Sequence, residues 1–344
     1  MLNVGVLGCG KIAQTRHIPE YVASKKCLLV GFYNPTSSRA EDMAKKYGGK
    51  VYMTPEEMLS DPDIEAVSVC AANYAHAELS VAALKAGKHV LCEKPMATSL
   101  EDCEKMIAAS KESGKRLMIA QNQRLNKAHV LAKQMIADGE IGTVITFRTT
   151  FGHGGPETWS ITPGKNTWFF DKKRAAMGAM ADLGIHKTDA IRYILGRDVV
   201  RTTARLATLD KRNENGELIS VDDNAICIYE MEGGVMGTMT ASWTYYGAED
   251  NSTIIYGTKG ILRIYDDPAH SLVLVTSDGE KKFFDVEQIQ TNDNQTFSGI
   301  IEEFESAVID GRESVFDAEK VLNSMKAVFA SIESSETGKP VEIR

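Results

Sequence analysis

An aspartate and a histidine four residues apart have the types and spacing of a proton-transfer pair. Asp182 and His186 lie in a segment near 180–195 that reads as a helix. Side chains at positions i and i+4 are neighbours on one helix face, so the carboxylate could orient the imidazole and stabilise its protonated form. That arrangement suits a general base near neutral pH. An exposed ion pair, a helix cap or a core histidine would give the same pattern.

The same two residues could also be metal ligands. That interpretation is weaker, because the chain has no H-E-x-x-H motif and no third ligand close by in the sequence. We therefore expect no metal site.

A lysine follows one of the predicted buried strands. Cys92-Glu93-Lys94-Pro95 ends an apolar run, and ligands of open α/β sheets bind outside the carboxyl ends of the strands. Lys94 at that place could donate a hydrogen bond to a substrate hydroxyl and stabilise charge on its oxygen. Judged without its position, a Lys-Pro pair at the start of a loop is more often simply solvated.

A glycine-rich turn opens the chain. Gly8-Cys9-Gly10-Lys11-Ile12-Ala13 reads G-x-G-x-x-A directly after the first predicted strand. In a dinucleotide site the first glycine allows the tight turn and the second lets a pyrophosphate approach the backbone. Gly8, Gly10, Lys11 and Ile12 are therefore predicted to contact the phosphates, which would meet the free N–H groups of the helix. The alternative is a tight turn in an unrelated α/β protein.

The end of the second predicted strand carries Asn34. A carboxylate is expected there in NAD-specific sites, where it binds the ribose hydroxyls. An amide can still bond a hydroxyl, and it does not repel a 2′-phosphate. We therefore expect NAD or NADP as cofactor, with NAD favoured.

The elements that must position these residues alternate in the first third of the chain. Alternating strands and helices predict parallel βαβ units. A Rossmann domain that binds NAD(P) is therefore expected over residues 1–122. Strands are expected at 4–7, 28–33, 66–70, 89–92 and 117–120, with helices near 11–23, 38–47 (Ser37 as N-cap) and 75–86. Thr54-Pro55-Glu56-Glu57 is expected to open another short helix, and a further helix is expected between its cap Ser99 and Gly114 after its end.

The pattern changes after about residue 122. One helix near 127–138, a strand at 144–151 and a long loop lead to the helix that carries Asp182 and His186. Successive strand-like runs follow from 199 to about 286, with Gly233-Gly234 and Asp278-Gly279 as hairpin turns, and then helices near 296–310 and 317–335. Residues 123–344 therefore predict an α+β domain with a large, mostly antiparallel sheet, for substrate binding and oligomerisation.

Composition excludes several classes of protein. The formal net charge is −8, so no global field attracts nucleic acid or an anionic membrane. No apolar stretch is long enough to span a bilayer. None of the six cysteines forms a C-x-x-C pair, which favours free thiols in a reducing compartment. We expect a cytoplasmic protein with no nucleic-acid or membrane partner.

Taken together, these motifs resemble the glucose–fructose oxidoreductase / inositol dehydrogenase / rhizopine catabolism family of NAD(P)-dependent oxidoreductases. The resemblance runs nearly the full length of the chain, and A-G-K-H-V-L-C-E-K-P at 86–95 is its most specific string. The chain departs from the family pattern at two places. Ala71-Ala72 stands where Thr-Pro is common, and only Gly178 remains of the three glycines that often precede the Asp/His helix. The matching motifs are the glycine turn, Asn73 with His76, 86–95, 122–124, 139–142 and D-x-G-x-H at 182–186.

The resemblance implies a role for several residues. Lys94 matches the catalytic lysine, and Asp182 with His186 matches the acid/base pair. Asn73, His76, Glu93 and Lys94 match cofactor-binding positions, and Trp168 matches an aromatic residue beside the active site. The family implies reversible oxidation of a secondary hydroxyl on a sugar or cyclitol without a metal, by a homodimer or homotetramer.

Four residues are predicted to bind the substrate: Asn122, Arg124, His153 and Trp168. Asn122 and Arg124 follow the last Rossmann strand, although Arg124 could instead be a structural ion-pair partner. His153 lies in the 151–170 loop, which could equally be a turn with core aromatics. The predicted activity is hydride transfer from a sugar or cyclitol hydroxyl. The rivals are a nucleotide-sensing protein without turnover and an NAD-assisted hydrolase or lyase.

Overall fold

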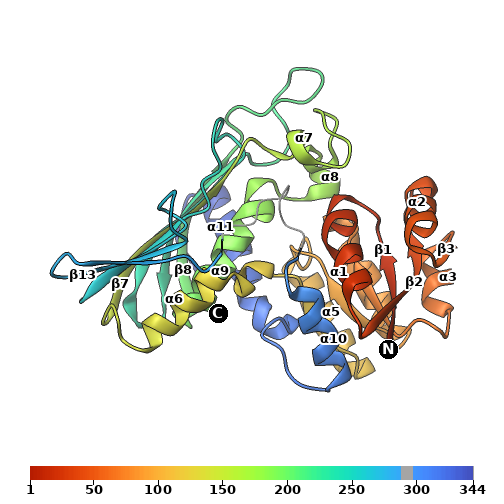
Figure 1. Cartoon of the computed structure of the whole chain (residues 1–344). Coiled ribbons are helices and arrows are strands. Elements are labelled where there is room, and N and C mark those ends of the chain that lie inside the picture. The colour runs from red at the N-terminus through yellow and green to blue at the C-terminus, as the bar shows by residue number, and fades with distance from the viewer. Residues whose placement is uncertain (288–296, 344) are drawn as a thin grey trace. The chain divides into compact units, whose positions relative to one another are not determined.

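The computed structural model describes residues 1–287 and 297–343, which form two compact units (Figure 1). The first unit contains Met1–Asn122, Lys173–Ala175 and the described residues within Asn292–Leu322. The second contains Gln123–Lys172, the described residues within Ala176–Thr291, and those from Asn323 onward. The functional ranges predicted above, 1–122 and 123–344, stay predictions.

The first unit is built on a parallel sheet of six strands, in the order β3-β2-β1-β4-β5-β6. Val4, Val6 and Leu7 of the central strand β1 are fully buried, as expected for a strand covered on both faces. This order is the doubly wound one, and it confirms the predicted Rossmann fold. The elements are β1 Leu2–Leu7, η1 Ala13–His17, α1 Ile18–Ala23, β2 Cys27–Tyr33, α2 Ser37–Tyr47, β3 Lys50–Tyr52, α3 Pro55–Ser60, β4 Ala66–Val69, η2 Asn73–Ala75, α4 His76–Lys85, β5 His89–Cys92, α5 Leu100–Ser113, β6 Leu117–Ile119 and α10 Ile300–Ile309.

Side-chain capping explains where two of these helices, α3 and α5, begin. The Thr54 side chain accepts a hydrogen bond from the Glu57 N–H at the start of α3. Ser99 caps α5 by accepting from the Asp102 N–H, 3.1 Å away. The prediction for α2 is wrong by one residue, because Ser37 is already helical and Thr36 is the N-cap, without a side-chain capping bond.

The second unit is built on a sheet of nine strands, in the order β14-β13-β12-β11-β7-β10-β9-β8-β15. Its pairs are antiparallel except for β7 with β10, which confirms the predicted mostly antiparallel sheet. The strands are β7 Val144–Gly152, β8 Val199–Ala207, β9 Asn224–Met231, β10 Met236–Ser242, β11 Thr253–Gly257, β12 Gly260–Ile264, β13 Leu272–Thr276, β14 Lys281–Phe284 and β15 Val341–Glu342.

Helices cover one face of this sheet. Helix α6 packs on β12, and α9 packs on β7. Ser331 of α11 meets Thr202 of β8, with 3.1 Å between the hydroxyl oxygens. The remaining helical elements of the chain are η3 Asn122–Leu125, α6 Lys127–Ala137, α7 Pro156–Trp159, η4 Trp168–Phe170, α8 Lys172–Ala175, η5 Met180–Gly184, α9 Ile185–Leu195, η6 Glu232–Gly234 and α11 Ala318–Thr337. Most of α8 and the start of α11 belong to the first unit.

Two predicted α-helices are divided in the structure. The segment after the glycine turn contains a π-helical stretch, η1, before α1, and the segment that carries Asp182 and His186 contains η5 before α9. Asp182 lies in the π-helical part, so the α-helical spacing argument does not hold there unchanged. π-helical turns are common at functional sites.

The cysteine prediction is confirmed, since all six cysteines are described and each is a buried free thiol. Among the described residues, no helix combines the length and apolar composition needed to cross a bilayer.

Candidate functional site

The glycine turn has the shape that a dinucleotide requires. Gly8 has a φ of 101°, and a Cβ there would lie 2.7 Å from the carbonyl oxygen of Cys70. At Gly10 a Cβ would meet only that oxygen, at 3.9 Å, so the backbone can be approached closely from that side. Lys11 and Ile12 begin the helix, whose first N–H groups have no partner within a helix. The turn therefore fits a pyrophosphate.

Asn34 supports this turn from the end of β2. Its Oδ1 accepts a hydrogen bond from the Cys9 N–H at 3.0 Å, and its Nδ2 donates to the Thr36 carbonyl at 2.9 Å. The side chain is nearly buried. The sequence predicted a ribose contact for Asn34, and the structure adds a second task, which is to hold the glycine turn.

Lys94 lies in a tightly held segment at the carboxyl end of β5. Glu93 is buried and accepts hydrogen bonds from His17 Nε2 at 2.9 Å and from the Lys94 N–H at 3.0 Å. The Lys94–Pro95 peptide bond is cis. Burial alone would raise the pKa of Glu93, but His17, Arg16 and Lys94 lower it to about 2. Glu93 is therefore a carboxylate at neutral pH, and Lys94 is more exposed than the residues on either side of it.

His76 and Asn73 brace neighbouring backbone. The ring nitrogens of His76 lie 2.7 Å from the Pro95 carbonyl and 3.1 Å from the Ala71 carbonyl. Burial lowers the pKa of His76, although the two carbonyls oppose that shift. Asn73 Nδ2 donates to the carbonyl of Ala175 at 3.0 Å. Both residues were predicted to bind the cofactor, and in this structure their side chains fix the loops at the carboxyl edge of the sheet.

In the second unit, Asp222 fixes the start of the segment that carries Asp182 and His186. Its two carboxylate oxygens accept the N–H groups of Gly178 and Met180, each at 2.8 Å. A Cβ on Gly178 would lie 1.8 Å from the Asp222 carbonyl oxygen. Glycine at 178 is therefore required by this close approach.

A chain of aromatic contacts connects His186 with Asp182, the two residues predicted to be the acid/base pair. Phe151 lies between His186 and His153, with ring centroids 6.1 Å and 5.8 Å away. The far side of His153 contacts Trp159 at 6.2 Å. The structure therefore brings His153, predicted to bind substrate, to the neighbourhood of His186.

The contacts continue from Trp159 back to Asp182. Phe169 lies 5.2 Å from Trp159 and stacks on Trp168 at 3.9 Å. It also meets Trp243 edge-on at 6.5 Å, and Trp243 Nε1 donates to Asp182 Oδ2 at 3.1 Å. The 151–170 loop thus contacts His186 through Phe151 and reaches Asp182 through Trp243, and Trp168 in this loop is partly exposed.

Arg124 has a structural partner. Its Nε and Nη2 donate to the two carboxylate oxygens of Asp189 at 2.7 and 2.6 Å, and both side chains are buried. Asp189 also accepts from Ser324 at 2.6 Å. This matches the alternative of an ion-pair partner, while substrate binding by Arg124 and by the nearly buried Asn122 stays a prediction.

Three supporting residues escaped the sequence argument: His17, Asp222 and Trp243. His17 lies 76 positions from Glu93, and Trp243 lies 61 positions from Asp182. Such pairs are set by the tertiary fold and leave no local spacing signal. The D-x-G-x-H string points to the supported residues but does not identify what supports them.

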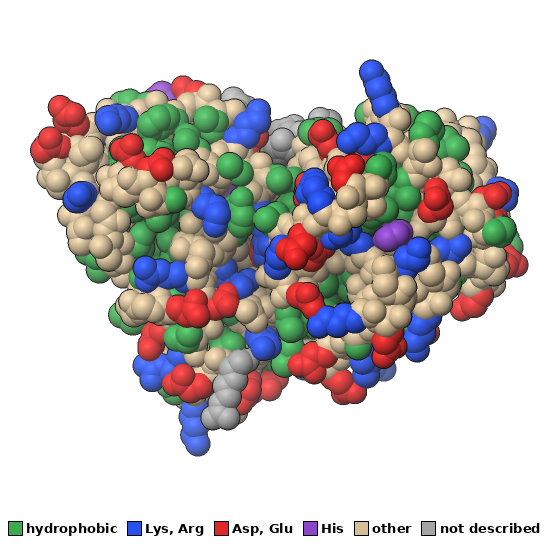
Figure 2. Space-filling view, turned by 90° about the horizontal axis from the view of Figure 1, so that it is seen from below, with side chains coloured by type: hydrophobic (Ala, Val, Ile, Leu, Met, Phe, Trp, Pro, Cys, Tyr) green, Lys and Arg blue, Asp and Glu red, His purple; other side chains and the backbone are tan. Residues whose placement is uncertain are grey.

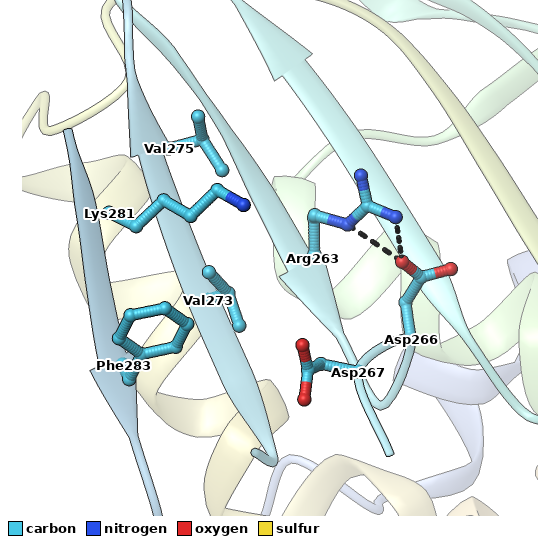
Figure 3. A pocket seen from close by; sticks show the side chains of 7 residues that line it. All are labelled: Arg263, Asp266, Asp267, Val273, Val275, Lys281 and Phe283. Carbon is cyan, nitrogen blue, oxygen red and sulfur yellow. Dashed lines mark hydrogen bonds and ion pairs between the residues drawn. The ribbon is translucent and has the colours of Figure 1, made fainter. Parts of the chain in front are cut away.

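A pocket lies elsewhere, on the solvent-facing side of β12, β13 and β14 (Figure 3). None of the residues predicted for catalysis or binding lines it, and Arg263 at its side is paired with Asp266. The lining residues are Arg263, Asp266, Asp267, Val273, Val275, Lys281 and Phe283. Within the described part of the chain, no group of three His, Cys, Asp or Glu side chains could hold a metal ion.

Two family models match the sequence. Residues 2–121 match the model of an oxidoreductase family with an NAD-binding Rossmann fold, and residues 129–263 match the GFO/IDH/MocA C-terminal domain. Together the matches span well over half of the chain.

Curated relatives and solved structures agree with these matches. The chain is 29% identical to myo-inositol 2-dehydrogenase of Thermotoga maritima over 80% of its length and 78% of the relative. It is 27% identical to 1,5-anhydro-D-fructose reductase of Ensifer adhaerens over 98% of both chains. A levoglucosan dehydrogenase solved with NADH and levoglucosan superposes with a TM-score of 0.86 at 25% identity, covering 100% of this chain and 99% of that one. The glycine turn, the Glu93-Lys94-Pro95 segment and the Asp182–His186 segment thus lie in a chain that belongs to the Gfo/Idh/MocA family of NAD-binding oxidoreductases.

Proposed function

We propose that this protein is an NAD(P)-dependent dehydrogenase that reversibly oxidises a secondary hydroxyl of a sugar or cyclitol. The observation that carries the proposal is the support around Lys94, whose backbone is held by buried Glu93 and whose neighbour Pro95 is held by His76. These contacts fix the backbone at the carboxyl end of β5, where ligands of open α/β sheets bind. Three of the curated relatives, named for inositol, anhydrofructose and levoglucosan chemistry, support this substrate class.

The residues of this chain divide the proton chemistry between them. His186, oriented by Asp182, accepts the proton of the substrate hydroxyl. The Lys94 ammonium donates a hydrogen bond to the same oxygen and stabilises the negative charge that develops there. A nicotinamide dinucleotide, when bound, supplies the hydride acceptor. Gly8, Gly10, Lys11 and Ile12 would hold its phosphates, with Asn34, Asn73, His76 and Glu93 as further cofactor-binding positions.

Substrate recognition is assigned to residues around this centre. His153 and Trp168 belong to the aromatic loop beside His186 and Asp182, and aromatic faces suit the apolar faces of sugars. In His153, Nδ1 accepts the Gly155 N–H at 2.9 Å, so the neutral ring carries its proton on Nε2 as a donor. Asn122 and Arg124 complete the proposed set, with Arg124 acting from its ion pair with Asp189.

The cellular setting is proposed from cysteine chemistry and surface charge. Six buried free thiols fit the reducing cytoplasm. On the face drawn in Figure 2, acidic and basic side chains lie interspersed, which does not favour a polyanionic partner. We propose small-molecule ligands and further copies of this chain as the partners.

The test combines a substrate panel with two variants. Polyols, cyclitols and aldoses are assayed with NAD and with NADP by absorbance of the reduced nicotinamide. Lys94→Ala is expected to lower turnover by at least about a hundredfold, with cofactor affinity changed only a few-fold, because its contact forms mainly in the transition state. Wild-type turnover should rise with pH, and His186→Ala should flatten that rise.

The outcomes separate the rival functions. Cofactor binding without turnover of any substrate in the panel would favour a nucleotide-sensing protein. Hydrolysis or elimination of a glycoside without net reduction of added cofactor would favour the NAD-assisted hydrolase or lyase. Near-normal turnover by Lys94→Ala would remove Lys94 from the mechanism.

A further inference from the structure

We propose that Trp243 is a positioning residue that holds the Asp182 carboxylate and couples it to the aromatic 151–170 loop. The inference rests on the proposed function, in which Asp182 orients His186. Trp243 follows β10, a strand far in sequence from both the loop and the pair. In this role Trp243 donates one indole N–H hydrogen bond to Asp182 from a fixed position.

The hydrogen bond itself is fully enclosed. Trp243 is 0% exposed and Asp182 is 7% exposed. Trp243 Nε1 donates to Asp182 Oδ2 at 3.1 Å. A carboxylate withdrawn from water depends on protein donors for its stability, and a buried indole N–H likewise requires an acceptor. Each group therefore constrains the other.

The backbone of Trp243 is anchored in turn. Its N–H donates to the Asp223 carbonyl at 2.8 Å. The Asp223 carboxylate accepts three backbone N–H groups, from Leu209, Asp210 and Lys211, each at 2.8 Å. The donor side of the bond to Asp182 is thus fixed to a rigid turn, and rotation of the Asp182 carboxylate would break the bond.

The indole ring of Trp243 also packs against the 151–170 loop. Phe169 meets it edge-on at 6.5 Å and Phe170 lies 6.0 Å away at 45°. Phe169 carries the contacts to Trp159 and Trp168. One side chain therefore touches both the loop proposed to hold the sugar and the carboxylate of the acid/base pair, so a displacement of the loop reaches Asp182 through Trp243.

A double-mutant cycle tests this coupling. Trp243→Phe keeps an aromatic ring and removes the N–H. We expect kcat to fall about tenfold, the size of one lost hydrogen bond to a charged group, with KM for NAD within twofold. In the Asp182→Ala background the same substitution should change kcat less than about twofold, since its acceptor is gone. If Trp243→Phe lowers kcat by the same factor in the wild-type and Asp182→Ala backgrounds, the inference is overturned.

Tyr229→Phe is the matched control. The Tyr229 hydroxyl is also buried and lies 2.9 Å from the Thr188 hydroxyl of α9, the helix that directly follows the segment with Asp182. Its removal therefore costs a neutral buried hydrogen bond beside that segment without touching Asp182. Its effect on kcat should be small and the same in both backgrounds. If Tyr229→Phe reproduces the pattern of Trp243→Phe, general loosening of the helix explains the result and Trp243 has no special role.

A spectroscopic measurement does not require activity. The chain has three tryptophans, so the indole N–H signal absent from Trp243→Phe identifies Trp243. That signal should shift in Asp182→Ala and stay in place in Tyr229→Phe, and an unshifted signal in Asp182→Ala would refute the hydrogen bond. If the wild type turns over no sugar or cyclitol, the proposed function fails before any variant is compared. If the wild type is active but the two substitutions lower kcat independently, only this inference fails.

Discussion

At the scale of single residues, the proposed catalytic side chains are positioned by neighbouring side chains that contact the main chain beside them. Glu93, His76 and Asp222 each accept from or face main-chain groups next to a proposed catalytic residue. Such contacts fix the backbone at Lys94 and Pro95 and at the start of the Asp182 segment. Proposed catalytic positions in both units are thus held by charged or polar residues.

Asn34 leads to a prediction about cofactor choice. Asn34→Asp keeps the acceptor for the Cys9 N–H, but it loses the donor to the Thr36 carbonyl and adds a negative charge that repels a 2′-phosphate. We expect wild type to use NAD with weak discrimination against NADP. The variant should raise the NAD-to-NADP ratio of kcat/KM by roughly tenfold or more, mainly through weaker use of NADP.

The control for this prediction is Asn34→Ala. It releases the glycine turn without adding charge, so both cofactors should lose efficiency together and the ratio should stay near that of wild type. A wild type that strongly prefers NADP would show that the 34–39 loop contains a phosphate site, and the interpretation of Asn34 would be wrong.

At the scale of elements, local signals located the helices and strands well. Pro55 and Ser99 mark real helix starts, and Gly233 and Gly234 have positive φ values in a real hairpin turn. The apolar runs of the first sheet are buried as predicted. What the sequence did not predict is the detail of helix geometry, because the π-helical stretches η1 and η5 have no signature at the level of hydrophobic spacing.

The sequence likewise predicts some residues of the candidate site and misses others. The glycine turn, Lys94 and the Asp182–His186 pair were predictable because each is a short string beside an element boundary. His17, Asp222 and Trp243 were not, because their partners are distant in sequence. For Asn34 the sequence predicted only a ribose contact, and its bond to the Cys9 N–H was not predictable because that bond depends on the two strand ends meeting.

Ala176 gives a prediction about the segment before the Asp182 helix. It has a φ of 65°, in the left-handed region that favours glycine, at a place where the resembling family often has glycine. Ala176→Gly should relieve about 1 kcal/mol of strain, partly offset by the greater freedom of glycine in the unfolded chain. We expect a small net rise in the free energy of unfolding, measured by urea denaturation.

Gly178→Ala is the contrasting variant. Its new Cβ would lie 1.8 Å from the Asp222 carbonyl oxygen, so backbone must move. It should destabilise the protein by more than about 2 kcal/mol, as expected when a residue is forced into an incompatible site. If both variants change the free energy of unfolding in the same direction and by a similar amount, the interpretation of Ala176 as strained and of Gly178 as required by a close backbone approach is wrong.

At the scale of the whole molecule, the nine-stranded sheet has one face covered by helices and another that carries exposed side chains. Ile226 and Ile228 of β9 are 58% and 45% exposed, and the neighbouring Met236 of β10 is 52% exposed. Threonines pair beside them, with Thr238 opposite Ile228 and Thr240 opposite Ile226. A sheet face that exposes apolar residues on adjacent strands is typical of a surface that another chain covers.

We therefore predict a homo-oligomer, at least a dimer, that uses this face. Sedimentation at micromolar concentration should show the oligomer for wild type and a monomer for the double variant Ile226→Lys with Ile228→Lys, because burying two ammonium groups from each protomer in a two-fold contact is costly. Val22→Lys is the matched control, since Val22 of α1 is 53% exposed and lies outside the sheet. A monomeric wild type refutes the prediction. An oligomer that survives the double variant but not Val22→Lys would move the interface to the first unit.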